Sequence, residues 1–198
     1  MLAGIRKVVH YGFDKMGLSI LLAALGILSA VQAKDSAVAV TRQEAVDPQP
    51  QEEQRHPRKA QEFKLEDQFR KIHHVTFPRT KPTVLIFADR RSARRAEKWV
   101  SPLYDRYKER IIIEGGGVGK SVPRWERSVI RFLLRKITPY PILLDWKGDV
   151  GRLYEFRYKH ANVYIIEPGG AIALQIVGKA TPERIEQAFT ALDALVDT

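Results

Sequence analysis

The sequence predicts an α/β domain with a mixed central sheet and helices on both faces. Short apolar runs, which are typical of buried strands, alternate along the chain with amphipathic segments at helical spacing. Near the C-terminus, two β-rich runs within residues 162–178 flank Glu167-Pro168-Gly169-Gly170, which is a strong hairpin signal because Pro and Gly supply the turn dihedrals. Alternating strands and helices followed by a hairpin imply this fold class.

The first half of the domain contributes two predicted strands and the helix between them. Residues 83–88 (TVLIFA) form a short apolar run, as in a buried strand. Apolar residues recur every three or four positions over residues 93–107 and predict an amphipathic helix. A second buried strand is predicted at residues 111–114, and the glycine-rich residues 115–122 are predicted to form a loop.

The second half contributes another long helix and the terminal elements. A helix is predicted from Pro123, which suits a first helical turn, to about Ile137. Its apolar face consists of Trp125, Val129, Phe132 and Leu133. A third strand at residues 142–145, a short helix at residues 149–156, the hairpin and a final helix from Pro182 complete the order.

The net charge of +10 belongs mainly to the predicted domain. Residues 63–198 carry 25 basic and 16 acidic side chains, whereas residues 1–33 and 34–62 have net charges of +2 and −1. The chain has no cysteine, which excludes disulfides, thiolate nucleophiles, Cys-ligated zinc and iron–sulfur clusters.

The N-terminus has the pattern of an export signal. Basic residues precede an uncharged apolar run at residues 16–33, which ends in small residues at a plausible signal-peptidase site. The length of this run also approaches that of a membrane span, so residues 1–33 are either a cleaved signal peptide or an uncleaved anchor. Both interpretations place the rest of the chain in the periplasm or another extracytoplasmic compartment. The anchor would tether it to the inner membrane.

Residues 34–62 are predicted to be a disordered linker. The segment is rich in Pro, Gln and Glu and has no aromatic residue, so it cannot bury enough apolar surface to offset the entropy of ordering. The folded domain is therefore predicted to span residues 63–198.

Two segments of this domain are similar to those of a known family. One is YPILLDWKGDVGRLYEF, followed by ANVYIIEPGGAI, and the other is TVLIFADRRSARRAEKW. Over about residues 70–196 the chain resembles the thioredoxin-like superfamily, on its peroxiredoxin and redoxin side. The second segment falls where that family has its first central strand, active-site loop and long helix. The resemblance implies a three-layer α/β/α domain with a mixed sheet, a C-terminal β-hairpin and a final helix.

The chain departs from this family where the family's chemistry lies. The resemblance places the catalytic cysteines in the loop after Ala88, and here that loop is DRRSARR. One count puts the two thiol positions at Arg91 and Arg94, and another puts them at Arg94 and Glu97. The family's cis-proline falls at Ala161. Because the chain has no cysteine, thiol redox catalysis of the family type is excluded.

The segment IIIEGGGVGKS, residues 111–121, imitates a phosphate-binding loop. Gly119, Lys120 and Ser121 match the end of that motif, but its first glycine is replaced by Glu114, whose carboxylate would repel phosphate. We therefore interpret the glycines as a connection between strand and helix, and we predict no nucleotide or other cofactor.

Four arginines surround a serine at the predicted start of the first long helix. A helix N-terminus favours negative charge, so this cluster is locally unfavourable and suggests a binding site for an anion or an acidic partner. A plain solvated basic face is the alternative. The predicted site consists of Arg90, Arg91, Ser92, Arg94 and Arg95.

A second basic stripe follows the other long helix, where arginines three and four residues apart share one face. It suits an acidic protein partner or anionic lipid headgroups, again with a solvated face as the alternative. The export signal argues against nucleic acid as the partner. The stripe consists of Arg124, Arg127, Arg131 and Arg135.

These features favour an exported, non-catalytic binding or accessory protein of the cell envelope. One alternative is a redoxin-related enzyme with a non-thiol, anion- or cofactor-binding site at the arginines. Another is an assembly factor for a membrane complex. His73 and His74 would point to opposite faces of a strand and so cannot chelate one ion, and no other spacing indicates a metal or a catalytic residue.

Overall fold

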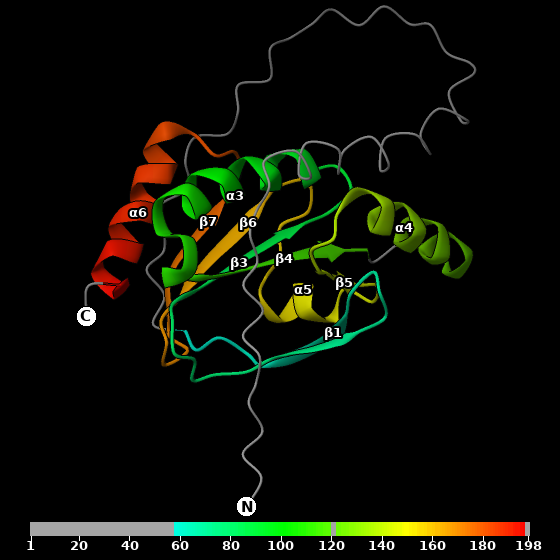
Figure 1. The fold of residues 1–198 in the computed structure, drawn as a ribbon, viewed down its shortest axis with the longest axis horizontal. Helices are drawn as coiled ribbons and strands as arrows, with labels where there is room; N and C mark the ends of the chain where they lie inside the picture. Colours follow the sequence, from blue (N-terminus) through cyan, green and yellow to red (C-terminus); the bar gives the residue numbers. More distant parts are fainter. Residues whose placement is uncertain (1–57, 120–121, 197–198) are drawn as a thin grey trace, which may run out of the picture.

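The computed structural model describes residues 58–119 and 122–196, and a seven-stranded mixed sheet forms its centre (Figure 1). The strand order across the sheet is β2-β1-β5-β4-β3-β6-β7. The strands are β1 (Phe63–Glu66), β2 (Ile72–Val75), β3 (Thr83–Ala88), β4 (Ile112–Val118), β5 (Ile142–Asp145), β6 (Asn162–Ile166) and β7 (Ile172–Val177).

The centre of the sheet is parallel and its two edges are antiparallel. β3 pairs in parallel with β4, and β4 pairs in parallel with β5. Parallel neighbours need long crossover connections, which are supplied by α3 (Ala93–Tyr107) and α4 (Arg124–Ile137). β6 and β7 form the predicted hairpin at one edge, and β1 and β2 form a second hairpin at the other.

The remaining helices are α5 (Asp149–Leu153), α6 (Pro182–Val196) and a short 3-10 helix, η2 (Lys108–Arg110), that follows α3. Figure 1 shows α3 and α6 next to each other, α5 on the other side of the sheet, and α4 beside the strands that it connects. Hydrogen bonds from the Tyr107 side chain to α6 hold α3 and α6 together.

Each face of the sheet has its own apolar core, because alternate side chains of a strand point to opposite faces. On the face covered by α3 and α6, the buried side chains of Trp99, Leu103 and Leu192 pack against Val84 of β3. The other face is dominated by a cluster of aromatic rings: Phe63, Phe87, Tyr154 and Tyr164. These layers confirm the three-layer α/β/α class.

The glycine-rich segment belongs to β4 and not to the loop that we predicted for residues 115–122. Gly115, Gly116 and Gly117 pair with β3 on one side and β5 on the other. Gly116 makes room for the ring of Phe87, since a Cβ atom at this position would lie 2.2 Å from the Phe87 Cε1 atom. A close packing contact therefore explains a glycine inside a central strand.

The domain begins before the boundary that we predicted at residue 63. Ala60 is buried, and its backbone N–H donates to the Gly170 carbonyl at 2.7 Å. Residues 58–62 are therefore part of the domain, because the hairpin turn supplies them with backbone partners. The predicted export signal and most of the predicted linker lie in residues 1–57, outside the described residues. No helix within the described ranges is both long and apolar enough to cross a bilayer.

α4 is oriented differently from our prediction. Trp125, Val129 and Phe132 are 68%, 39% and 51% exposed, although we predicted that they form the helix's apolar face together with Leu133. The side that meets the sheet instead carries Leu133 and the buried Leu134. The helix is apolar on two sides, and only one of them packs on the domain.

Candidate functional site

The turn between β3 and α3, residues 89–95, occupies the place to which the family resemblance assigns the active-site loop. Asp89 organises this turn. Its Oδ1 atom accepts hydrogen bonds from the backbone N–H groups of Arg91 (3.0 Å) and Ser92 (2.9 Å) and from the Ser92 hydroxyl (2.7 Å). Such a carboxylate satisfies N–H groups that a helix start leaves without partners inside the helix. We call residues 89–95 the arginine turn.

Ser92, which we predicted as part of the anion- or partner-binding site, is a structural residue of the arginine turn. Its side chain is fully buried, and its hydroxyl oxygen also accepts the backbone N–H of Asp89 at 2.9 Å. Because the hydroxyl donates and accepts within the turn and is shielded from solvent, it cannot contact a partner or act as a nucleophile.

The loop before β6 is attached to the arginine turn at two points. The backbone N–H of Lys159 donates to Asp89 Oδ2 at 2.7 Å, and the Arg95 guanidinium donates to the Lys159 carbonyl at 2.6 Å. Both carboxylate oxygens of Asp89 therefore have partners inside the protein. Sequence patterns did not indicate Lys159, which lies 64 residues after Arg95 and meets the turn only in the folded chain.

The exposed cations of this site come from both segments. Arg90, Arg91 and Arg94 are exposed on the arginine turn, whereas Arg95 is partly buried by its contact with the loop. The side chain of Lys159 is exposed on the loop. Guanidinium groups form directed, charge-assisted hydrogen bonds with carboxylates and phosphates, so this end of the sheet is chemically suited to a negatively charged surface.

Ala161, at the predicted position of the family's cis-proline, is fully buried. Its carbonyl accepts the Gly178 N–H at 2.8 Å, and the Trp99 indole N–H donates to the Gly178 carbonyl at 3.1 Å. The position is therefore integrated into the core, and no proline ring shapes the surface beside the arginine turn.

Solved structures identify the fold. A putative thiol:disulfide interchange protein DsbE from Chlorobium tepidum aligns at 17% identity with a TM-score of 0.50, over 70% of this chain and 95% of its own. The fold is thioredoxin-like. Peroxidoxin BcpB from Mycobacterium tuberculosis aligns at 18% identity (TM-score 0.51, 70% and 96% covered). The exposed lipoprotein thioredoxin Etrx1 from Streptococcus pneumoniae aligns at 13% identity with a TM-score of 0.53, over 67% of this chain and 100% of its own. No protein-family model and no curated protein matches the sequence.

This thioredoxin-like domain lacks the reactive group of thiol enzymes. The sequence contains no cysteine, so the arginine turn has no thiol to exchange with a disulfide or to reduce a peroxide. The structural likeness therefore defines the scaffold, and the function has to be argued from the side chains that this chain carries.

The structure divides the second basic stripe on α4 into fixed and exposed arginines. The guanidinium carbons of Arg127 and Arg131 lie 5.5 and 5.7 Å from the centre of the Trp146 ring. Arg131 also pairs with Glu66 of β1 at 2.7 Å. These two arginines attach α4 to the domain. The exposed members of the stripe are Arg124 and Arg135.

The outward face of α4 combines apolar and basic groups. The Lys136 ammonium lies 5.8 Å from the centre of the exposed Phe132 ring. Arg124, Arg135 and Lys136 are exposed around the apolar residues of this face. Glu126 is the one acidic residue in the α4 sequence, and it lines a cavity on the other side of the helix.

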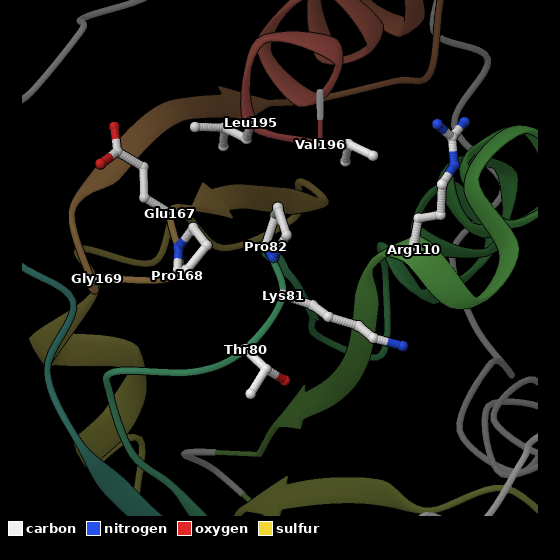
Figure 2. Close-up of a pocket in the computed structure, with 9 residues that line it drawn as sticks. All are labelled: Thr80, Lys81, Pro82, Arg110, Glu167, Pro168, Gly169, Leu195 and Val196. Carbon is white, nitrogen blue, oxygen red and sulfur yellow. The ribbon is translucent and has the colours of Figure 1, made fainter. Parts of the chain in front are cut away.

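A pocket of about 520 Å³ lies at the other end of β3 from the arginine turn, beside Pro82 (Figure 2). Figure 2 shows that its charged side chains, Lys81, Arg110 and Glu167, point in different directions. The Lys81 ammonium donates to the Glu109 carbonyl at 2.5 Å. Because its polar groups do not converge, this pocket is a weaker candidate site than the arginine turn.

The structure gives no support to a phosphate-binding loop at residues 111–121. The glycines that would surround a phosphate lie in β4, and the Glu114 carboxylate pairs with Arg79 at 3.0 Å. Lys120 and Ser121 lie outside the described residues. A strand that is paired on both sides cannot wrap around a phosphate group.

Two of the histidines that the structure describes, His73 and His74, are adjacent in β2. His73 Nε2 lies 2.7 Å from Asp67 Oδ2, and the neighbouring His74 is exposed. In the part of the chain that the structure describes, no three His, Asp or Glu side chains are grouped so that they could hold a metal ion.

Proposed function

We propose that this chain is a non-catalytic, thioredoxin-like binding protein of the cell envelope, which engages an acidic protein partner through the arginine turn. The observation that carries the proposal is the replacement of the expected cysteine loop by a rigid turn that exposes Arg91 and Arg94. The exposed Lys159 extends the same surface.

Binding is favoured over catalysis because the turn lacks a reactive group. Its hydroxyl, on Ser92, is buried, and its carboxylate, on Asp89, is hydrogen-bonded through both oxygens. A nucleophile requires an exposed reactive atom next to a general base, and the arginine turn offers neither. The same argument disfavours a non-thiol enzyme site at the arginines.

An extended acidic surface is favoured over a small anion. Helix N–H groups are the usual ligands of a small anion, and here Asp89 already accepts from the first N–H groups of the turn. What remains for a partner is a set of guanidinium and ammonium groups distributed over two segments. Several separated carboxylates of a protein partner match this distribution better than one phosphate does.

Two observations support a location in the cell envelope. The sequence has an apolar run at residues 16–33 with basic residues before it. In addition, the pneumococcal protein with the same fold is an exposed lipoprotein thioredoxin. An assembly factor for a membrane complex would be one form of such an envelope binding protein.

The proposal is tested by affinity purification from solubilised envelope with wild-type protein and with Arg91→Glu/Arg94→Glu. The matched control is Lys64→Glu/Lys71→Glu, which changes the net charge equally at exposed positions in β1 and the β1–β2 turn. We expect a partner with wild type and control that is lost in the arginine variant. Equal recovery with all three proteins, or no partner of the wild type, would contradict the proposal.

We further propose that the outward face of α4 contacts an anionic bilayer surface. Trp125, Val129 and Phe132 form an exposed apolar stripe with Arg124, Arg135 and Lys136 around it. This combination is typical of helices that lie in the interface of an anionic membrane. The contact involves the exposed members of the basic stripe and not Arg127 or Arg131.

The bilayer contact is tested with a single cysteine, Val129→Cys, that carries an environment-sensitive fluorophore. We expect a blue shift on adding phosphatidylglycerol vesicles and little change with phosphatidylcholine vesicles. The same label at Lys64→Cys serves as the control for attachment through other parts of the chain. Equal responses at both positions, or no response at position 129, would exclude this contact.

A further inference from the structure

The central strand β4 has glycines, and therefore no side chains, at two positions that face α3 and α4. Side chains alternate along a strand, and Gly116 faces the Phe87 ring, so Gly115 and Gly117 face the opposite side. Both are partly exposed although they lie in the middle of a seven-stranded sheet. The missing side chains leave the floor of a cavity between the two helices.

The walls of this cavity are mostly apolar. It has a volume of about 180 Å³ and is lined by residues of the sheet and of both helices. The apolar walls include Ile86, Val100, Ile130, Leu133, Ile142 and Leu144. Glu97 also lines the cavity, and partial burial raises the pKa of its carboxyl.

Packing does not require the two glycines of the floor. A Cβ atom on Gly115 would come no closer than 3.7 Å to Ile142, and one on Gly117 no closer than 3.6 Å to Leu144. Both distances are ordinary van der Waals contacts, in contrast to the collision at Gly116. Glycine weakens a strand, and one reason for its presence there is the close approach of a ligand or of another backbone.

We propose that this cavity is a binding site for a small, uncharged, apolar molecule about the size of one aromatic ring. An engineered protein cavity of about 150 Å³ with aliphatic and aromatic walls stays dry and binds benzene, which sets the scale. Asp89 and Arg90 line one end of the cavity. The ligand would therefore lie directly behind the arginine turn, independently of what the turn binds.

Thermal unfolding of the full chain with and without toluene tests this site. Toluene raises the unfolding temperature of the wild type by a few degrees, because a ligand that binds only the folded state stabilises it. Gly117→Val fills the floor, so this variant unfolds at or above the wild-type temperature and no longer responds to toluene. Gly169→Val, in the exposed hairpin turn where a Cβ meets nothing within 4 Å, keeps the wild-type response.

No toluene effect on the wild type, or an equal effect on Gly117→Val, overturns the proposal. A second measurement covers the case in which Gly117→Val does not fold. The chain has no cysteine, so Gly117→Cys carries a unique thiol whose rate of modification by benzyl methanethiosulfonate can be followed. Toluene should slow this reaction several-fold, and it should not slow the reaction of the exposed thiol in Lys64→Cys. Equal protection at both positions, or protection at neither, would contradict the proposed binding site.

Discussion

α3 and α4 are two helices of similar length that border the same cavity, yet they are held in opposite ways. α3 buries Trp99, Leu103 and Tyr107 and is connected to α6 by hydrogen bonds. α4 buries Leu134 alone and exposes three large apolar side chains. The strand beneath α3 is fully buried, whereas the strand beneath α4 contains three glycines.

The two helices therefore contribute differently to the fold and to the surface. α3 fixes the arginine turn at its N-terminus, so the cations there are presented by a rigid element. α4 forms one wall of a cavity and carries an apolar face without a partner among the described residues. α3 therefore anchors the core, whereas the packing of α4 leaves a cavity and an exposed apolar face.

The largest expected effect is at Trp99, on the buried side of α3. Trp99→Ala removes a fully buried ring and the indole hydrogen bond to the Gly178 carbonyl, and should lower the free energy of unfolding by about 3–5 kcal/mol. Trp125→Ala on α4 is the matched control and should change it by less than about 0.5 kcal/mol. Urea denaturation measures both, and similar losses would remove the contrast between the helices.

The glycines of β4 give the next largest effect. Gly116→Ala pushes a methyl group into the Phe87 ring and should destabilise the domain by about 1–3 kcal/mol. Gly117→Ala points into the cavity and should stabilise it by about 0.5–1 kcal/mol, since alanine loses less entropy in a strand. Denaturation curves of the two single variants decide this, and changes of the same sign would contradict the assigned directions.

The contact between α3 and α6 should depend on pH. The Tyr107 hydroxyl lies 2.7 Å from Asp193 Oδ1, and this hydrogen bond, with Arg106 nearby, lowers the pKa of Asp193. The resulting stability is present above the unfolded-state pKa near 3.9 and is lost as the pH falls through the lower folded-state value.

Tyr107→Phe removes this hydrogen bond and should lower the free energy of unfolding by about 1 kcal/mol at pH 7. The loss relative to the wild type should shrink as the pH falls below about 4. Denaturation midpoints measured from pH 7 down to pH 3 test this, and a pH-independent difference would show that Asp193 is not the group involved.

The smallest expected effect on stability is at the arginine turn. Arg91→Glu/Arg94→Glu replaces positive by negative charge at the start of α3, where the helix dipole favours negative charge. Arg94 also interacts with Glu97, so the new carboxylate at position 94 repels Glu97 and offsets part of this gain. The net change should stay below about 1 kcal/mol, although we expect the variant to lose the partner. A larger loss of stability would point to a structural role for these arginines.

Local patterns predicted the elements that depend on local propensity. The apolar run at residues 83–88 became β3, and the Pro-Gly-Gly turn joined β6 and β7 as expected. β1 and β2 were not predicted, because each has four residues of which only two are apolar. They form strands by pairing with each other, and β1 joins the sheet beside β5.

The candidate site was predicted only in part, for two physical reasons. The arginines are adjacent in sequence, but Lys159 reaches them through tertiary contacts. The burial of Ser92 follows from its hydrogen bonds with Asp89, which residue type alone does not reveal. On α4, two apolar sides compete for the sheet, and the sequence does not specify which one packs.

The central claim is that the arginine turn faces an acidic protein partner. A benzophenone attached to Lys98→Cys, one helical turn after Arg94 on α3, should form photo-crosslinks to the partner in intact envelope while every arginine is retained. The crosslinks should disappear when Arg91→Glu/Arg94→Glu is added, and the same label at Lys64→Cys should give none. Identical crosslinks from both positions, or crosslinks that persist after charge reversal, would contradict the claim.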